Sequence, residues 1–164
     1  MENYKDQRNF SQGNYHQKEG TNSRTQHQSS KGGYGIDTKQ IFNEMKFDST
    51  WIKNETDKNL IDFAETAGKY MARNGLTNSK IRRIYSEIKR IQMEGFEKEK
   101  ASFYLLRPKV AYALGREPYN KGLELFKIIF EKCAIDVVDE KTYKNFCNLL
   151  EAVLAYHKAH GGKD

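Results

Sequence analysis

The sequence has few cysteines and no long apolar segment, and each shortage excludes a class of protein. No apolar run approaches the roughly 18–20 residues that a transmembrane helix needs. Residues 1–35 contain no Val, Ile or Leu, which argues against a signal peptide. The two cysteines, Cys133 and Cys147, lie in apolar helical patterns, so we expect no disulfide scaffold. We therefore expect a protein of the reducing cytoplasm with no membrane partner.

Residues 1–35, which we call the leader, are rich in Gln, Asn, Ser and Gly. They cannot bury enough apolar area to offset the entropy of ordering the chain, so we expect the leader to be disordered. Scattered aromatic and basic residues could contact RNA weakly, but we favour a solvated segment with no fixed partner. The remaining residues, 36–164, are enough for one helical domain.

Beyond the leader, apolar residues recur at the i, i+3, i+4, i+7 spacing of amphipathic helices. No strand-length segment alternates apolar and polar residues. We expect helices at about 36–45, 60–73, 78–91, 98–114, 120–135 and 140–160, with Trp51 anchoring the loop after the first. A proline inside a helix removes a hydrogen bond, so Pro108 should kink or break the fourth. The sequence thus predicts an all-α fold, a compact bundle of five to six helices with a disordered N-terminal tail.

Charge is distributed unevenly along the chain. In total there are 28 Lys and Arg against 22 Asp and Glu, for a net charge of +6. Residues 66–116 hold 12 basic and 4 acidic side chains, whereas residues 41–65 hold 3 basic and 6 acidic. One contiguous third is therefore strongly basic, which favours a polyanionic partner.

The predicted helix at 78–91 places several cations opposite its apolar stripe. At 100° per residue, Arg82, Arg83, Lys89 and Arg90 share the outer face, and Lys80 lies at its border. On this helix no carboxylate falls on that face, so we expect the cations to be unpaired. Such a face suits phosphate. An ordinary solvated surface explains it as well.

A second basic cluster surrounds Pro108. Arg107 and Lys109 flank the proline, and Arg116 follows Gly115 at the end of the helix. Arginine grips phosphate well because its planar fork donates two parallel hydrogen bonds. Tyr112 could stack on a base. We favour a core position for Tyr112, with its hydroxyl at the surface.

The sequence offers no catalytic constellation. It has no Gly-rich phosphate loop, no nucleophile elbow and no nucleophile–base–orienter set. His157 and His160 are spaced i, i+3, but no third ligand accompanies them, so we expect a solvent-facing pair and no metal. We expect no cofactor and no enzyme activity.

Three stretches in order and spacing resemble one known family. They are Gly75–Arg82 (GLTNSKIR), Leu106–Arg116 (LRPKVAYALGR) and Glu151–Asp164 (EAVLAYHKAHGGKD). Together they resemble the small subunit of type III-A CRISPR–Cas effector complexes, the Csm complex, from about residue 57 onward. The leader departs from that family's compact pattern.

The resemblance implies a helical, non-catalytic subunit present in several copies, which with other Csm subunits lines the channel for guide RNA and target RNA. By motif position, Arg82, Arg107 and Arg116 would be the leading RNA contacts, with Lys80, Arg83 and Lys109 beside them. Lys158 would contact either RNA or a neighbouring subunit. Contacts independent of sequence should go to phosphate and the 2′-hydroxyl. The alternative is a helical protein-interaction module whose basic third meets an acidic partner, with RNA contact incidental.

Overall fold

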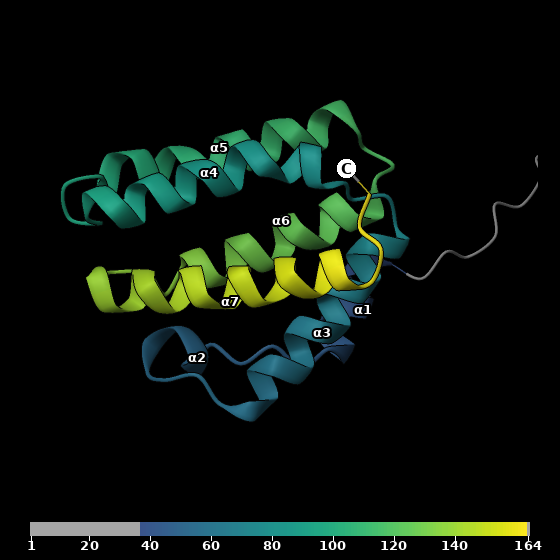
Figure 1. The fold of residues 1–164 in the computed structure, drawn as a ribbon, viewed down its shortest axis with the longest axis horizontal. Coiled ribbons are helices and arrows are strands. Elements are labelled where there is room, and N and C mark those ends of the chain that lie inside the picture. The colour runs from purple at the N-terminus through teal and green to yellow at the C-terminus, as the bar shows by residue number, and fades with distance from the viewer. Residues whose placement is uncertain (1–36, 164) are drawn as a thin grey trace, which may run out of the picture. The chain divides into compact units, whose positions relative to one another are not determined.

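A computed structural model describes residues 37–163, and these residues form an all-α domain (Figure 1). The predicted leader, together with Ile36 and Asp164, lies outside the described residues. The helices are α1 (Thr38–Glu44), α2 (Thr50–Lys53), α3 (Lys58–Arg73), α4 (Asn78–Glu94), α5 (Lys100–Arg116), α6 (Lys121–Ala134) and α7 (Glu140–Ala159). The all-α prediction is confirmed.

The described residues form seven helices, one more than the upper expectation. The extra element is α2, a single turn in the segment that was expected to be a loop. It carries Trp51 and Ile52 into the core, where their side chains are 2% and 0% exposed. The Nδ2 group of Asn145 in α7 donates to the carbonyls of Ile52 and Asn54, both at 3.0 Å, and thereby ties the end of α2 to the bundle.

Helix boundaries follow local capping chemistry. The side chains of Asp57, Asn120 and Asp139 accept hydrogen bonds from backbone N–H groups in the first turns of α3, α6 and α7. Thr77 occupies the N-cap position of α4, although its hydroxyl makes no capping bond. Gly75, at φ +91°, lies in the turn between α3 and α4, in a conformation that favours glycine.

The helices form three layers (Figure 1). The α4/α5 pair lies on one side of the α6/α7 pair, and α1, α2 and α3 lie on the other. The most extensive contact between two helices is that of α3 with α7. There, a Cβ on Gly68 would lie 2.6 Å from the backbone nitrogen of His157, so this position in α3 accommodates only glycine without a shift.

Helix α5 continues through Pro108, so of the predicted kink or break, the break does not occur. Proline has no backbone N–H, so the carbonyl four residues before Pro108 lacks its helical hydrogen bond. Pro108 and its neighbours Arg107 and Lys109 are exposed, so this carbonyl lies on the solvent side of the helix. No helix within residues 37–163 has the length and apolar character needed to cross a bilayer.

Candidate nucleic-acid interface

Helix α4 separates two basic grooves. Its apolar stripe, Ile81, Ile84, Ile88 and Ile91, is buried against the neighbouring helices. Arg82 and Arg83 are consecutive, so they leave the helix about 100° apart and line different grooves.

The α4/α5 groove has a volume of about 420 Å³. Four cations line it: Lys80 and Arg83 from α4, and Lys109 and Arg116 from α5. Tyr112 of α5 also lines the groove and is 69% exposed, so the prediction of a core position is wrong. Its ring lies on the face of α5 away from the buried Phe103, Leu106 and Val110. An exposed aromatic ring among cations can stack on a base while the cations hold phosphate.

Only one carboxylate, Glu117, lines this groove, against four cations. The Nζ of Lys80 lies 2.6 Å from Glu117 Oε2, and this hydrogen bond lowers the pKa of Glu117. Within residues 37–163, no carboxylate lies within 4.0 Å of the guanidinium groups of Arg83 and Arg116. The groove therefore retains positive charge available to an external anion.

The α4/α7 groove lies on the other side of α4 and also measures about 420 Å³. It is lined by Arg82 of α4 and Lys158 of α7, and Tyr85 of α4 also lines it. Arg82 is exposed and has no carboxylate within 4.0 Å among the described side chains. This groove holds one carboxylate, Glu151, which pairs with Lys89 at 3.4 Å.

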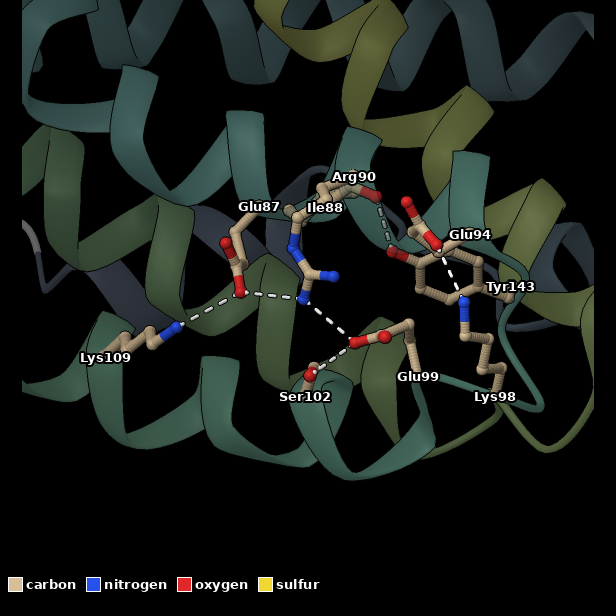
Figure 2. Close-up of polar contacts among 9 residues, drawn as sticks. All are labelled: Glu87, Ile88, Arg90, Glu94, Lys98, Glu99, Ser102, Lys109 and Tyr143. Atoms are coloured by element: carbon tan, nitrogen blue, oxygen red, sulfur yellow. Dashed lines mark hydrogen bonds and ion pairs between the residues drawn. The ribbon is translucent and has the colours of Figure 1, made fainter.

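Arg90 occupies an ion-pair cluster between α4 and α5 (Figure 2). Its Nη2 lies 2.9 Å from Glu99 Oε2 and 3.1 Å from Glu87 Oε1. Lys109 approaches the same Glu87 oxygen at 3.4 Å, and the hydroxyl of Ser102 donates to Glu99 at 2.7 Å. The hydrogen bonds from Arg90 lower the pKa values of both carboxyls.

The expectation that no carboxylate neutralises the outer face of α4 is therefore wrong for Lys89 and Arg90. Arg90 pairs with Glu87 of the same helix, which the helical wheel places outside that face, and with Glu99 at the start of α5, while Lys89 pairs with Glu151 of α7. A helical wheel counts only the residues of its own helix, so it cannot show the partners from α5 and α7.

Arg107 is not brought together with the other predicted contacts. It lies on the side of α5 that faces α6, where its Nε is 3.7 Å from Glu131 Oε1. It lines a small cavity of about 180 Å³ with Phe103, Phe130 and Ile135. Arg107 and Arg116 share one sequence motif but point to different sides of α5.

His157 is buried, which corrects the expectation of a solvent-facing histidine pair. Its side chain is 0% exposed, and its Nε2 lies 2.9 Å from the carbonyl of Leu76, in the turn before α4. Gly162 folds back over the ring, and its N–H donates to the carbonyl of His157 at 2.9 Å. His160 is half-buried, 3.4 Å from Glu65. In the part of the chain that the structure describes, no group of three His, Cys, Asp or Glu residues could hold a metal ion.

The two cysteines are also unsuited to nucleophilic catalysis. Cys133 and Cys147 are free and buried. Burial raises the pKa of the Cys147 thiol to about 12, so this thiol is protonated and a poor nucleophile at neutral pH.

Some groove residues were missed by sequence reasoning. Asn78 and Tyr85 line the α4/α7 groove, and Ser79 lines the α4/α5 groove. Tyr85 lies at the border of the apolar stripe of α4 and is only partly buried. The sequence feature that could have predicted a groove position for Tyr85 is its place at the border of the stripe, four residues before Lys89.

Comparison with known proteins identifies the family. A sequence profile described as "Csm2 Type III-A" matches residues 54–163. The chain belongs to the Csm2 family of type III-A CRISPR systems. It is 32% identical over 120 residues to a protein of Streptococcus thermophilus described as "CRISPR system Cms protein Csm2", an alignment that covers 66% of this chain and 97% of that protein. No solved structure matches.

Membership of the Csm2 family makes the chain a small subunit of a Csm complex, and other Csm subunits are its partners. Csm2 is not known as a catalytic family. The matched residues include both basic grooves, because α4, α5 and α7 lie within residues 54–163. Helices α1 and α2 lie outside the match.

Proposed function

We propose that this Csm2 family member is a non-catalytic, cytoplasmic RNA-binding subunit, present in several copies that line the channel for guide RNA and target RNA. In this proposal, the α4/α5 and α4/α7 grooves hold the sugar–phosphate backbone of target RNA. The observation that carries it is the α4/α5 groove, in which Lys80, Arg83, Lys109 and Arg116 surround an exposed tyrosine with one carboxylate among them.

We order the predicted RNA contacts by their exposure and by their ion pairs within the domain. Arg82, Arg83 and Arg116 are the leading contacts, since they are exposed and have no carboxylate within 4.0 Å among the described residues. Lys80, Lys109 and Lys158 support them from the groove walls. We assign Arg90 and Lys89 mainly to intramolecular ion pairs, and Arg107 to a surface outside both grooves.

The affinity of one subunit for RNA should be modest and should fall steeply with salt, because each neutralised phosphate releases counterions. Repetition of the subunit along the complex raises the affinity through avidity. Backbone contacts also fit the task, because a guide–target duplex must be held whatever its sequence.

The test uses the reconstituted Csm complex and measures the affinity for target RNA over a range of salt. We expect Arg83→Ala combined with Arg116→Ala to weaken binding by about tenfold or more, since hydrogen bonds to charged groups contribute about 1.5–3 kcal/mol each. The salt dependence should also become shallower. Arg107→Ala is the matched control, because it removes an exposed arginine outside both grooves and should change affinity less.

Two results would contradict the proposal. A complex with Arg82, Arg83 and Arg116 all replaced by Ala that binds RNA like the wild type would show that the grooves are not the site. RNA binding that does not respond to salt, together with failed assembly of the triple variant, would favour the alternative function. In that alternative, the basic grooves receive an acidic protein partner and RNA contact is incidental.

A further inference from the structure

Tyr112 is the aromatic residue in the lining of the α4/α5 groove, and the domain does not hold its ring. Tyr112 is 69% exposed, and within residues 37–163 it makes no hydrogen bond and no ring contact. Tyr143 shows how a tyrosine serves the fold. It is buried, stacks on Phe96 with the ring centroids 4.9 Å apart, and donates its hydroxyl proton to the carbonyl of Ile88 at 2.8 Å. The ring of Tyr112, by contrast, is open to a ligand.

The position of Tyr112 matters more than its exposure, because single exposed aromatic residues are common on protein surfaces. Lys109, Tyr112 and Arg116 are spaced three and four residues apart, so they share one face of α5. At 1.5 Å per residue, Lys109 lies about 4.5 Å before Tyr112 along the helix axis and Arg116 about 6 Å after it. Arg83 lines the α4 side of the same groove. The ring therefore lies between cations along the groove.

An aromatic ring between cations suits an unpaired nucleotide better than a paired one. In a duplex the two faces of each base are covered by the neighbouring base pairs, so a protein reaches mainly phosphates and 2′-hydroxyls. Cations alone are sufficient for such contacts. A tyrosine ring adds affinity where the face of a base is open, and proteins that bind single-stranded RNA combine stacking rings with cations for this reason.

The size and lining of the α4/α5 groove also suit one nucleotide. Its volume of about 420 Å³ lies within the range of about 300–1,000 Å³ that is usual for small-molecule sites. The buried side chains of Ile84 and Leu123 belong to the lining and give it an apolar part, which suits the plane of a base. Its carboxylate, Glu117, already pairs with Lys80, so it leaves Arg83 and Arg116 available to phosphate.

We propose that the α4/α5 groove binds an unpaired nucleotide of target RNA, whose base stacks on Tyr112 while Arg83, Lys109 and Arg116 hold the adjoining phosphates. This inference rests on the proposed function of the groove, and it adds that the bound nucleotide is not paired with the guide. Every base has a π-face, so this contact does not select a sequence.

The first experiment measures the affinity of the reconstituted Csm complex for target RNA over a range of salt. Tyr112→Ala removes the ring and should weaken binding by about tenfold or more. The salt dependence should stay the same, because the ring neutralises no phosphate. Tyr112→Phe keeps the ring and should bind within about twofold of the wild type. Tyr119→Ala is the matched control and should bind like the wild type, since Tyr119 is 92% exposed and lines neither basic groove.

The second experiment locates the base that stacks on Tyr112. A series of target RNAs carries one abasic nucleotide each, at successive positions. At a position that occupies the groove, the missing base should weaken binding to the wild-type complex by about fivefold or more. The same RNA should bind the Tyr112→Ala complex as well as the intact RNA does, because the base and the ring belong to one contact.

Four results would overturn the inference: wild-type affinity of Tyr112→Ala, an equal loss in Tyr112→Phe, a shallower salt dependence in Tyr112→Ala, or an abasic series without a position that depends on Tyr112. The double variant Arg83→Ala with Arg116→Ala is measured in parallel. If it loses affinity while Tyr112→Ala does not, the stacked base is refuted and the proposed function stands. If both variants bind like the wild type, the proposed function of this groove fails as well.

Discussion

The guanidinium of Arg90 lies 2.9 Å from the carboxylate of Glu99, and this pair joins the last turns of α4 to the start of α5. The hydroxyl of Ser102 donates to the same carboxylate, so Glu99 is held from both helices (Figure 2). Cations that look available for RNA in the sequence can thus be engaged within the domain. The basic third of the chain has two parts, one that holds α4 against α5 and one that faces the solvent.

Glu99→Gln should lower the stability of the domain and leave RNA affinity unchanged. The substitution keeps the shape of the side chain and removes its charge, so Arg90 loses its shortest ion pair. We expect a fall of a few degrees in melting temperature, with RNA binding by the assembled complex equal to the wild type. A loss of RNA affinity without any loss of stability would show that Arg90 and Glu99 belong to the interface.

Low pH should weaken the ion pairs that join α4 to α5. Hydrogen bonds from Arg90 and from Lys80 hold the pKa values of Glu87, Glu99 and Glu117 below the ordinary 4.5. A carboxyl with a lowered folded pKa contributes stability above its unfolded pKa, and that contribution is lost as the pH falls through the folded value. The gap in melting temperature between the wild type and Glu99→Gln should therefore narrow from about pH 7 to about pH 3. A gap that stays constant would contradict this assignment.

The same substitution should have opposite effects in two helices. In α3, a Cβ on Gly68 would meet backbone atoms of α7 at 2.6 and 2.7 Å, so Gly68→Ala should destabilise the domain by about 1–3 kcal/mol. In α5, a Cβ on Gly115 would meet nothing within 4 Å, so Gly115→Ala should stabilise by about 0.5–1 kcal/mol through helix propensity. Urea unfolding of both variants measures whether the free energy of unfolding falls or rises. Equal changes in the two variants would contradict this prediction.

His157 should be a structural residue and His160 should not. His157→Ala removes a buried ring and its contact with the carbonyl of Leu76, so we expect a loss of about 2–4 kcal/mol in unfolding free energy. His160→Ala removes a half-buried ring and should change stability by no more than about 0.5 kcal/mol. Chemical denaturation monitored by circular dichroism distinguishes them, and similar losses would contradict the difference in role.

The sequence predicted the long helices well because apolar residues recur along them at helical spacing, and because three of them begin at a capping side chain. The helices predicted at 120–135 and 140–160 begin next to Asn120 and Asp139, whose side chains make the capping bonds. Helix α2 was not predicted, because a segment of four residues is too short to show the apolar periodicity of a helix. Of the two effects predicted for Pro108, a kink or a break, the break does not occur, and Pro108 lies on an exposed face of the continuous helix α5.

The site was predicted only in part, for a different reason. The concentration of charge in residues 66–116 pointed to α4 and α5, whose cations line the α4/α5 groove. Which of these cations are engaged within the domain depends on ion pairs between residues far apart in the chain. Lys89 and Glu151 are 62 positions apart and meet at 3.4 Å. The burial of His157 likewise depends on Leu76, 81 positions away. The assignment of individual residues to RNA remains a prediction.

The course of the last residues bears on how the protein should be handled. The carbonyl of Lys163 accepts from the backbone N–H of Asn78 at 2.7 Å, and Asn78 lines the α4/α7 groove. A purification tag or fluorescent protein fused beyond Lys163 would emerge beside Arg82 and Lys158. Binding assays on C-terminal fusions would then report an obstructed groove, and an untagged chain is the appropriate reagent.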